Sequence, residues 1–389
     1  MKFLISLVIL LSCCFATGQE NLAPVVAAPP AEEVARLNLD PFYKKHLSVG
    51  GFPIVGSEQV SDHAFYEAAF IINRMLGRRQ DIIDALVESK VRLAIMAPDE
   101  FTTDIPEHAT LKPKIYWDKR ARGLGASSER PAVSVGEENL LGLKGDPYST
   151  ESIMIHEFAH AIHLMGINSI DSEFQGRLEN AFNRAGLKGL WRGKYAGTNP
   201  SEYWAEVVQS WFDTNRENDH DHNHVDTREE LKEHDPDAAE LVESIFGDRK
   251  WKYSHPKDRK NPRYLKGFDL ATAPVFSWPE DLVKAYEALD RGEGLKLAEL
   301  RKMEELLAKA TSPESANAVK LRVDNETKQR ITVSWIGFDG LRREYGLTDP
   351  TRHFDQNTFE GHLWVVTDEK GKDLGWFATP AEDCRVVVK

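Results

Sequence analysis

The chain has 389 residues, which is too long for one ordinary domain and predicts two or three. Hydrophobic residues make up 41% and charged residues 29%, which excludes both a mainly disordered chain and a protein with many membrane spans. Lys and Arg number 49 against 62 Asp and Glu, so the formal net charge is −13. Because basic residues dominate affinity for nucleic-acid phosphates, this balance argues against a nucleic-acid partner.

The N-terminus predicts export from the cytoplasm. Lys2 precedes an apolar run of about fourteen residues, and small residues follow it, a pattern typical of a signal peptide over 1–18. The run is shorter than the roughly twenty residues of a membrane-spanning helix. An alternative remains, because Leu10-Leu11-Ser12-Cys13 resembles a bacterial lipoprotein box in which Cys13 carries a lipid anchor. We therefore expect a secreted or extracytoplasmic protein, or one anchored at the cell envelope.

The rest of the chain predicts an α+β fold in four segments. They are an Ala- and Pro-rich linker over 19–39, a mixed domain over 40–268, a helical connector over 269–317 and a small all-β sandwich over 318–389. The connector contains two amphipathic stretches within 279–310, separated by Gly292-Glu293-Gly294, and both predict helices.

Apolar spacing predicts the elements of the mixed domain in chain order. Helices are expected over 60–77, 80–89, 150–165 and 200–213, and buried strands over 91–96 and 132–135. The strand at 132–135 is a candidate edge strand, to which an extended peptide could add. The sandwich is expected from short strands at 330–335, 361–367 and 385–388, with turn residues between them.

The sequence His156-Glu157-Phe158-Ala159-His160 is an HExxH motif within the predicted helix at 150–165. Residues four positions apart share one helix face, so both imidazoles can bind one Zn²⁺ ion. Glu157 then lies beside the open metal position and can take a proton from water. Apolar residues on both sides of the motif predict a buried helix, and a buried helix seldom contains two histidines and a glutamate without a use for them.

A third metal ligand is expected from a later helix. The metzincin pattern is excluded, because it requires Gly at 163 and His at 166, and this chain has His163 and Gly166. Glu202 and Glu206 lie four residues apart in the helix that follows Pro200. One of them can bind the metal while the other supports a metal-binding histidine.

Taken together, HEFAH, Tyr195 and the sequence Glu202-Tyr203-Trp204-Ala205-Glu206 resemble the catalytic core of anthrax lethal factor and its relatives. The resemblance covers about residues 150–214 and implies a zincin-like zinc metallopeptidase. It also implies roles for six residues: His156, His160 and Glu202 as zinc ligands, Glu157 as base, Tyr195 as oxyanion stabiliser and Glu206 as support for a ligand. The expected reaction is hydrolysis of a protein or peptide substrate, whose sequence the resemblance does not give.

Other histidines predict less. The run from Asp219 to His224 contains three alternating histidines that could bind a metal, but the polar stretch 217–237 around them favours a solvated loop. His163 follows the motif by one turn and is expected to pack or to support a ligand rather than to bind the metal.

Residues 319–389 resemble the β domain of the von Hippel–Lindau tumour suppressor, through Val333-Ser334-Trp335, Phe338-Asp339-Gly340 and the stretch from Thr358 to Trp364. In that family a pocket holds a hydroxyproline-containing peptide. The resemblance implies that the matching pocket residues here are Tyr345, Thr358, His362 and Trp364. The alternative is that these aromatic residues only form the core of a small sandwich.

The sequence therefore predicts an exported zinc endopeptidase with a C-terminal peptide- or protein-binding module. A catalytically inactive zincin-fold binding protein is the alternative, although such a scaffold has no need for Glu157 or Tyr195. An intracellular adaptor built on the C-terminal module is a third reading, which the signal-like N-terminus argues against.

Overall fold

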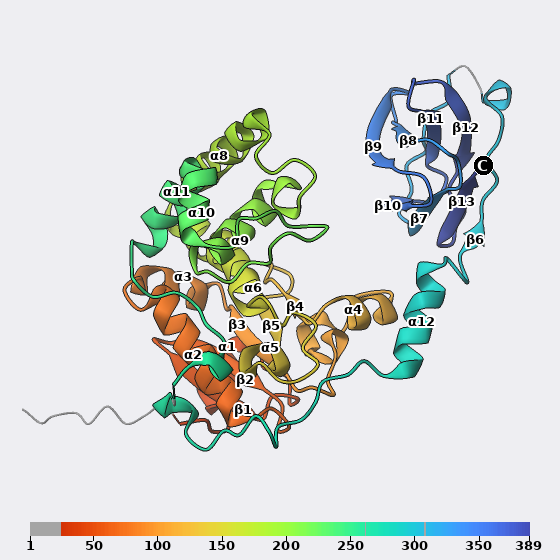
Figure 1. Cartoon of the computed structure of the whole chain (residues 1–389). Coiled ribbons are helices and arrows are strands. Elements are labelled where there is room, and N and C mark those ends of the chain that lie inside the picture. The colour runs from red at the N-terminus through yellow and green to blue at the C-terminus, as the bar shows by residue number, and fades with distance from the viewer. Residues whose placement is uncertain (1–24, 261, 307–308) are drawn as a thin grey trace, which may run out of the picture. The chain divides into compact units, whose positions relative to one another are not determined.

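The computed structural model describes residues 25–260, 262–306 and 309–389 (Figure 1). The expected signal peptide, the start of the linker and the candidate lipid site at Cys13 lie outside these residues. The described chain is mixed α+β with three sheets and forms two compact units, which meet in sequence between Trp278 and Pro279. No helix in the described ranges is both long and apolar enough to cross a membrane.

The first unit contains one mixed sheet. Its strands are β1 (Lys45–Val49), β2 (Phe52–Gly56), β3 (Arg92–Met96), β4 (Gly123–Leu124) and β5 (Ala132–Gly136), in the order β1-β2-β3-β5-β4. The three inner strands are parallel, and the two edge strands are antiparallel to their neighbours. The prediction that residues 132–135 form an edge is wrong, because β4 covers β5. A two-residue strand that begins with glycine has no apolar pattern to reveal it.

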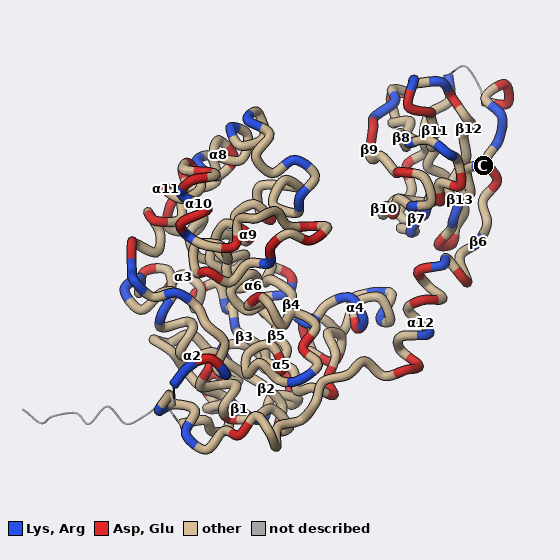
Figure 2. The backbone as a smooth tube through the Cα atoms, viewed as in Figure 1, with Lys and Arg blue, Asp and Glu red and all other residues tan. Residues whose placement is uncertain are grey.

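Both faces of this sheet are buried, because successive side chains of a strand point to opposite faces. Leu93 and Ile95 of β3 belong to the main core, together with Val133 and Val135 of β5. Ala94 and Met96 of β3 face a second, smaller cluster on the other side. Burial on both faces explains why the inner strands are nearly free of charged residues, whereas the helices α8 (Phe174–Lys188), α10 (Arg228–His234) and α11 (Pro236–Phe246) carry many (Figure 2).

The α-helices described in the first unit are α1 (Ala31–Leu37), α2 (Asp62–Leu76), α3 (Gln80–Glu88), α4 (Lys114–Arg120), α5 (Glu137–Leu141), α6 (Ile153–Ala161), α7 (Asn168–Ile170), α8 (Phe174–Lys188), α9 (Pro200–Trp211), α10 (Arg228–His234) and α11 (Pro236–Phe246). Some of them pack against the sheet, among them α2, α3, α5 and α6, whereas α8, α10 and α11 pack against α9 (Figure 1). The helices expected at 60–77, 80–89 and 200–213 are confirmed within two residues at each end. The helix expected at 150–165 is shorter, because the α-helix ends at Ala161 and continues as a π-helix over Ile162–Ile167.

The second unit starts with α12 (Glu280–Asp290) and continues with strands. They are β6 (Lys296–Leu297), β7 (Ala318–Asn325), β8 (Ile331–Ile336), β9 (Arg342–Thr348), β10 (His353–Phe359), β11 (Leu363–Asp368), β12 (Asp373–Ala378) and β13 (Cys384–Val388). The first amphipathic stretch of the connector is thus a helix. The second is not: it contains the short strand β6 and one 3₁₀ turn over Met303–Glu305, because β6 pairs with β13.

The strands of the second unit form two four-stranded sheets with one core. Their orders are β10-β7-β13-β6 and β12-β11-β8-β9, and most neighbouring strands are antiparallel. Val323 and Val386 from the first of these sheets and Val333 and Trp364 from the second belong to a single buried cluster. The two sheets therefore share an apolar interior, which also includes the free thiol of Cys384.

Candidate metal centre

The HExxH motif lies on α6, which is almost completely buried. The hydroxyl of Ser152 accepts a hydrogen bond from the backbone N–H of Ile155 and so begins the helix. Met154 and Phe158 are fully buried in the main core. These contacts fix the rotation of α6, and the opposite face then presents His156 and His160 side by side.

Helix α9 provides the carboxylates. The side chain of Asn199 accepts hydrogen bonds from the N–H groups of Ser201 and Glu202, and Pro200 occupies the first helical position. The indole N–H of Trp204 donates to the carbonyl oxygen of Ala159 at 2.9 Å, which fixes α9 against α6. The carboxylate of Glu202 is consequently held in contact with the imidazoles of His156 and His160.

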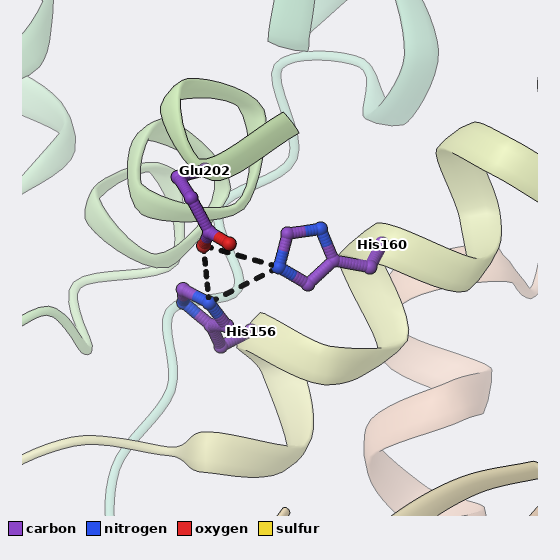
Figure 3. A group of neighbouring side chains, drawn as sticks. All are labelled: His156, His160 and Glu202. Carbon is purple, nitrogen blue, oxygen red and sulfur yellow. Dashed lines mark hydrogen bonds and ion pairs between the residues drawn. The ribbon is translucent and has the colours of Figure 1, made fainter. Parts of the chain in front are cut away.

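Three donor atoms meet at one point between the helices (Figure 3). Nε2 of His156 lies 3.2 Å from Nε2 of His160, and each of these nitrogens lies 3.3 Å from Oε2 of Glu202. Such spacings fit three ligands of a tetrahedral ion that lies about 2.0 Å from each. Oε2 of Glu202 is buried and has no hydrogen-bond partner among the described residues. A bound cation would supply the missing partner. The donor set therefore fits zinc.

The charges around the three donors favour a cation. Burial alone would lower the pKa of His156, but Glu202, Glu157 and Glu206 raise this pKa to about 10. Burial alone would raise the pKa of Glu202, but His156 and His160 hold it well below its usual range. A site that keeps a proton on a buried imidazole at neutral pH also attracts a metal ion, and the ion and the proton compete for the same nitrogen.

Glu157 and Tyr195 line one cavity of about 240 Å³ together with His156. The ring of Tyr195 stacks on that of His156 with a centroid distance of 6.3 Å and an angle of 26°. Burial, followed by the charge of Glu202, raises the pKa of Tyr195, so its hydroxyl keeps its proton at neutral pH. Arg120 also lines the cavity, where nearby phenols, that of Tyr195 among them, raise its pKa against the effect of burial.

The outer nitrogens of both histidines have partners. Nδ1 of His156 lies 2.8 Å from Oε1 of Gln209 and 3.5 Å from Oε1 of Glu206. Nδ1 of His160 lies 3.0 Å from the hydroxyl oxygen of Ser201. Such partners set the tautomer and the ring orientation of a metal-binding histidine and leave Nε2 free for the ion.

Strand β4 passes directly over the motif. A Cβ atom at Gly123 would lie 2.9 Å from Cγ2 of Ile153 and 3.1 Å from Cγ of Glu157. A Cβ atom at Gly125 would lie 3.0 Å from Cβ of His160. Only residues without a side chain allow the edge of the sheet to approach the motif this closely.

Sequence reasoning missed several of these residues. His222 belongs to the run expected to be solvated, yet it is only 4% exposed, and Nε2 lies 3.3 Å from Oε2 of Glu206. Gln209 is also buried, and its only sequence signal is that it lies seven residues after Glu202, on the same side of α9. His163, expected to pack or to support a ligand, does pack: it is buried beside the rings of Phe174 and Trp204, and its Nε2 lies 2.8 Å from Oε1 of Gln175.

The four residues expected in the C-terminal pocket line one cavity of about 450 Å³ in the second unit. The hydroxyl oxygen of Thr358 lies 3.1 Å from Nδ1 of His362. The ring of Tyr345 meets that of Trp364 edge to face at 5.2 Å. Trp364 is fully buried and its indole N–H has no partner within the described chain, whereas Tyr345 is 46% exposed. These aromatic residues thus serve both the core and a cavity.

Comparison of the sequence with protein-family models gives no match. Comparison with curated proteins gives none either.

Proposed function

We propose that the first unit is a zinc-dependent endopeptidase of the zincin type. The observation that supports this best is the triangle of donor atoms from His156, His160 and Glu202, with Glu157 and Tyr195 in the adjoining cavity. The mixed sheet, with an antiparallel edge strand above the HExxH helix, is consistent with a zincin-like fold.

Each residue of the centre has a chemical role in this proposal. Zinc, when bound, polarises a carbonyl group and lowers the pKa of water. The carboxylate of Glu157 accepts a proton from the attacking water and later donates it to the leaving amine. The hydroxyl of Tyr195 donates a hydrogen bond to the oxygen on which negative charge develops. Gln209 and Glu206 hold His156 in the orientation described above.

A substrate peptide would lie extended along β4, because this strand is the free edge of the sheet nearest the motif. Backbone hydrogen bonds to the edge would align the scissile bond with the cavity that contains Glu157. The substrate class expected from this arrangement is a protein segment without regular structure at the cleavage site.

Cleavage of a peptide library by the chain without its expected signal tests the proposal, with Glu157→Gln beside it. The variant should keep zinc and lose about 10²-fold or more in rate. Glu173→Gln is the matched control, because Glu173 is exposed and lies outside the centre. Zinc binding without cleavage by any of the three proteins would favour the alternative, a binding protein that keeps the zincin fold.

We further propose that the cavity of the second unit binds a peptide, with hydroxyproline as the first ligand to test. The unpartnered N–H of Trp364 and the Thr358–His362 pair offer hydrogen bonds to a ligand hydroxyl or carbonyl group. Tyr345 supplies an aromatic wall for a pyrrolidine ring. Pull-down with hydroxylated and plain proline peptides tests this, and equal binding would remove the preference for the hydroxyl group.

We also propose that the chain is exported, either secreted or held at the cell envelope by a lipid on Cys13, because residues 1–18 have the pattern of a signal peptide. Fractionation of the expressing cell tests it. Recovery of the protein in the cytoplasm with residues 1–18 still attached would contradict both forms of the proposal.

A further inference from the structure

A closed cycle of polar side chains extends outward from His156. Starting at its Nδ1, the cycle runs through Gln209, Glu151, Arg216, Asp219, His222 and Glu206 and returns to the same atom. We call these seven residues the polar cycle. It joins α6 and α9 to the loop over residues 213–226, which contains the histidine run.

Contacts of 2.8–3.5 Å connect the cycle. On one side, Oε1 of Gln209 accepts a hydrogen bond from Nδ1 of His156 at 2.8 Å, and Nε2 of Gln209 donates to Oε2 of Glu151 at 3.0 Å. Glu151 forms an ion pair with Nε of Arg216 at 2.9 Å. On the other side, Glu206 lies 3.5 Å from His156 and 3.3 Å from Nε2 of His222.

Two further contacts close the cycle through the loop. Nδ1 of His222 lies 2.8 Å from Oδ1 of Asp219, and Oδ2 of Asp219 lies 3.3 Å from Nη1 of Arg216. His222 is thus held between two carboxylates, one on α9 and one on the loop. Burial alone would lower the pKa of His222, but Glu206 and Asp219 raise it. Each ring nitrogen of His222 thus faces a carboxylate oxygen, which can accept a hydrogen bond from it.

The same loop also holds Tyr195. The backbone N–H of Tyr195 donates to the carbonyl oxygen of Asp221 at 2.8 Å. The ammonium group of Lys194 donates to the carbonyl oxygen of Asp219 at 3.0 Å. The stretch 219–222 consequently makes two contacts with the centre. The side chain of His222 contacts Glu206, which supports His156, and the backbone of Asp221 holds Tyr195, the expected oxyanion stabiliser.

We propose that His222 is a positioning residue of the metal centre: it fixes Glu206, and with it the orientation of His156, and it anchors the loop that places Tyr195. This inference rests on the proposed function for its catalytic part only. The zinc-binding part stands on the geometry of the cycle.

His222→Gln tests the proposal, because glutamine has one donor nitrogen, whereas His222 contacts its two carboxylates through two different nitrogens. His220→Gln is the matched control: it lies on the same loop, and its side chain is 85% exposed. Zinc affinity is measured by competition with a chromogenic chelator. Loss of a direct outer partner of a metal-binding histidine weakens metal affinity by about 10- to 100-fold. His222 contacts such a partner, Glu206, and not His156 itself, so we expect a loss at the lower end, about 10-fold, for His222→Gln and none for His220→Gln.

Cleavage kinetics provide a second measurement. We expect kcat to fall by about 10-fold or more in His222→Gln, because misplacing His156 and Tyr195 removes stabilisation made in the transition state. His222 also lines the cavity that contains Glu157, so a rise in KM alone, with kcat unchanged, would indicate substrate contact instead of positioning. In a Tyr195→Phe background the same substitution should cost less, because part of its effect passes through Tyr195. An equal fold-loss in kcat in the two backgrounds would show that His222 does not act through Tyr195.

The outcomes separate a positioning role from a structural one. Reduced stability with zinc affinity and kcat within two-fold of His220→Gln would overturn the proposal. If His222→Gln does not fold, Asp219→Asn is judged by the same measurements, since it removes the more exposed of the two carboxylates. If no peptide is cleaved even by the wild-type chain, the peptidase proposal fails, and zinc affinity still decides whether His222 positions His156.

Discussion

A methyl group at residue 123 would test the contact between β4 and α6. In Gly123→Ala the new Cβ atom would lie 2.9 Å from Ile153 and 3.1 Å from Glu157, closer than ordinary carbon contacts. Overpacking of this kind costs about 1–3 kcal/mol in the free energy of unfolding. Because the same contact displaces Glu157, and a shift near 1 Å can cost about 10²-fold in rate, cleavage should fall more than stability does.

Gly186→Ala is the matched control for this experiment. Gly186 lies on α8, and a Cβ atom there would meet nothing within 4 Å. Alanine restricts the unfolded chain, so this variant should gain about 0.4–1 kcal/mol. Urea unfolding followed by tryptophan fluorescence measures both changes. If Gly123→Ala unfolds at the same urea concentration as the wild-type chain, β4 does not lie against α6 as described.

Three more predictions concern the first unit. Arg122→Met should lower the free energy of unfolding by about 3–5 kcal/mol, measured by urea unfolding, because the fully buried Glu138 would keep an unpaired charge. The two residues now form hydrogen bonds of 2.5 and 2.9 Å, and adding Glu138→Leu should recover part of the loss. Burial raises the pKa of Glu137 from 4.5 to about 7, so the folded chain holds this proton more tightly than the unfolded chain. The resulting stabilisation is complete below pH 4.5 and is lost as the pH rises to about 7, about 3 kcal/mol in total, and Glu137→Gln should lack this decline when unfolding is measured from pH 4.5 to 8. Removal of zinc by a chelator should lower the melting temperature. If free zinc was present at 100 times its Kd, the lost stabilisation is about 2.7 kcal/mol. His160→Ala should show no effect of the chelator.

The parts of the centre that the sequence predicts are those with local periodicity. His156 and His160 share a helix face by their spacing, and Glu202 and Glu206 do so on α9. The members of each pair are one helical turn apart, so their proximity follows from local spacing and does not depend on tertiary contacts. The apolar flanks of the HExxH motif then predict that its helix is buried, whereas the contact between this helix and the Glu202–Glu206 face follows only from the structure.

The parts that sequence reasoning missed depend on contacts between distant segments. His222 looks like one of several solvated histidines, and only its position between Glu206 and Asp219 distinguishes it from the exposed His220. The edge strand β4 was missed because its glycine is required by contact with Ile153 and Glu157, which follow about thirty residues later. No periodic pattern records such contacts.

The shortness of β4 has a consequence for self-association. A long exposed edge strand pairs readily with the edge of another copy and promotes aggregation. Gly123 and Leu124 offer only a two-residue ladder, so two copies gain few backbone hydrogen bonds by pairing here. The same limit applies to a bound peptide, whose affinity must then come mainly from its side chains.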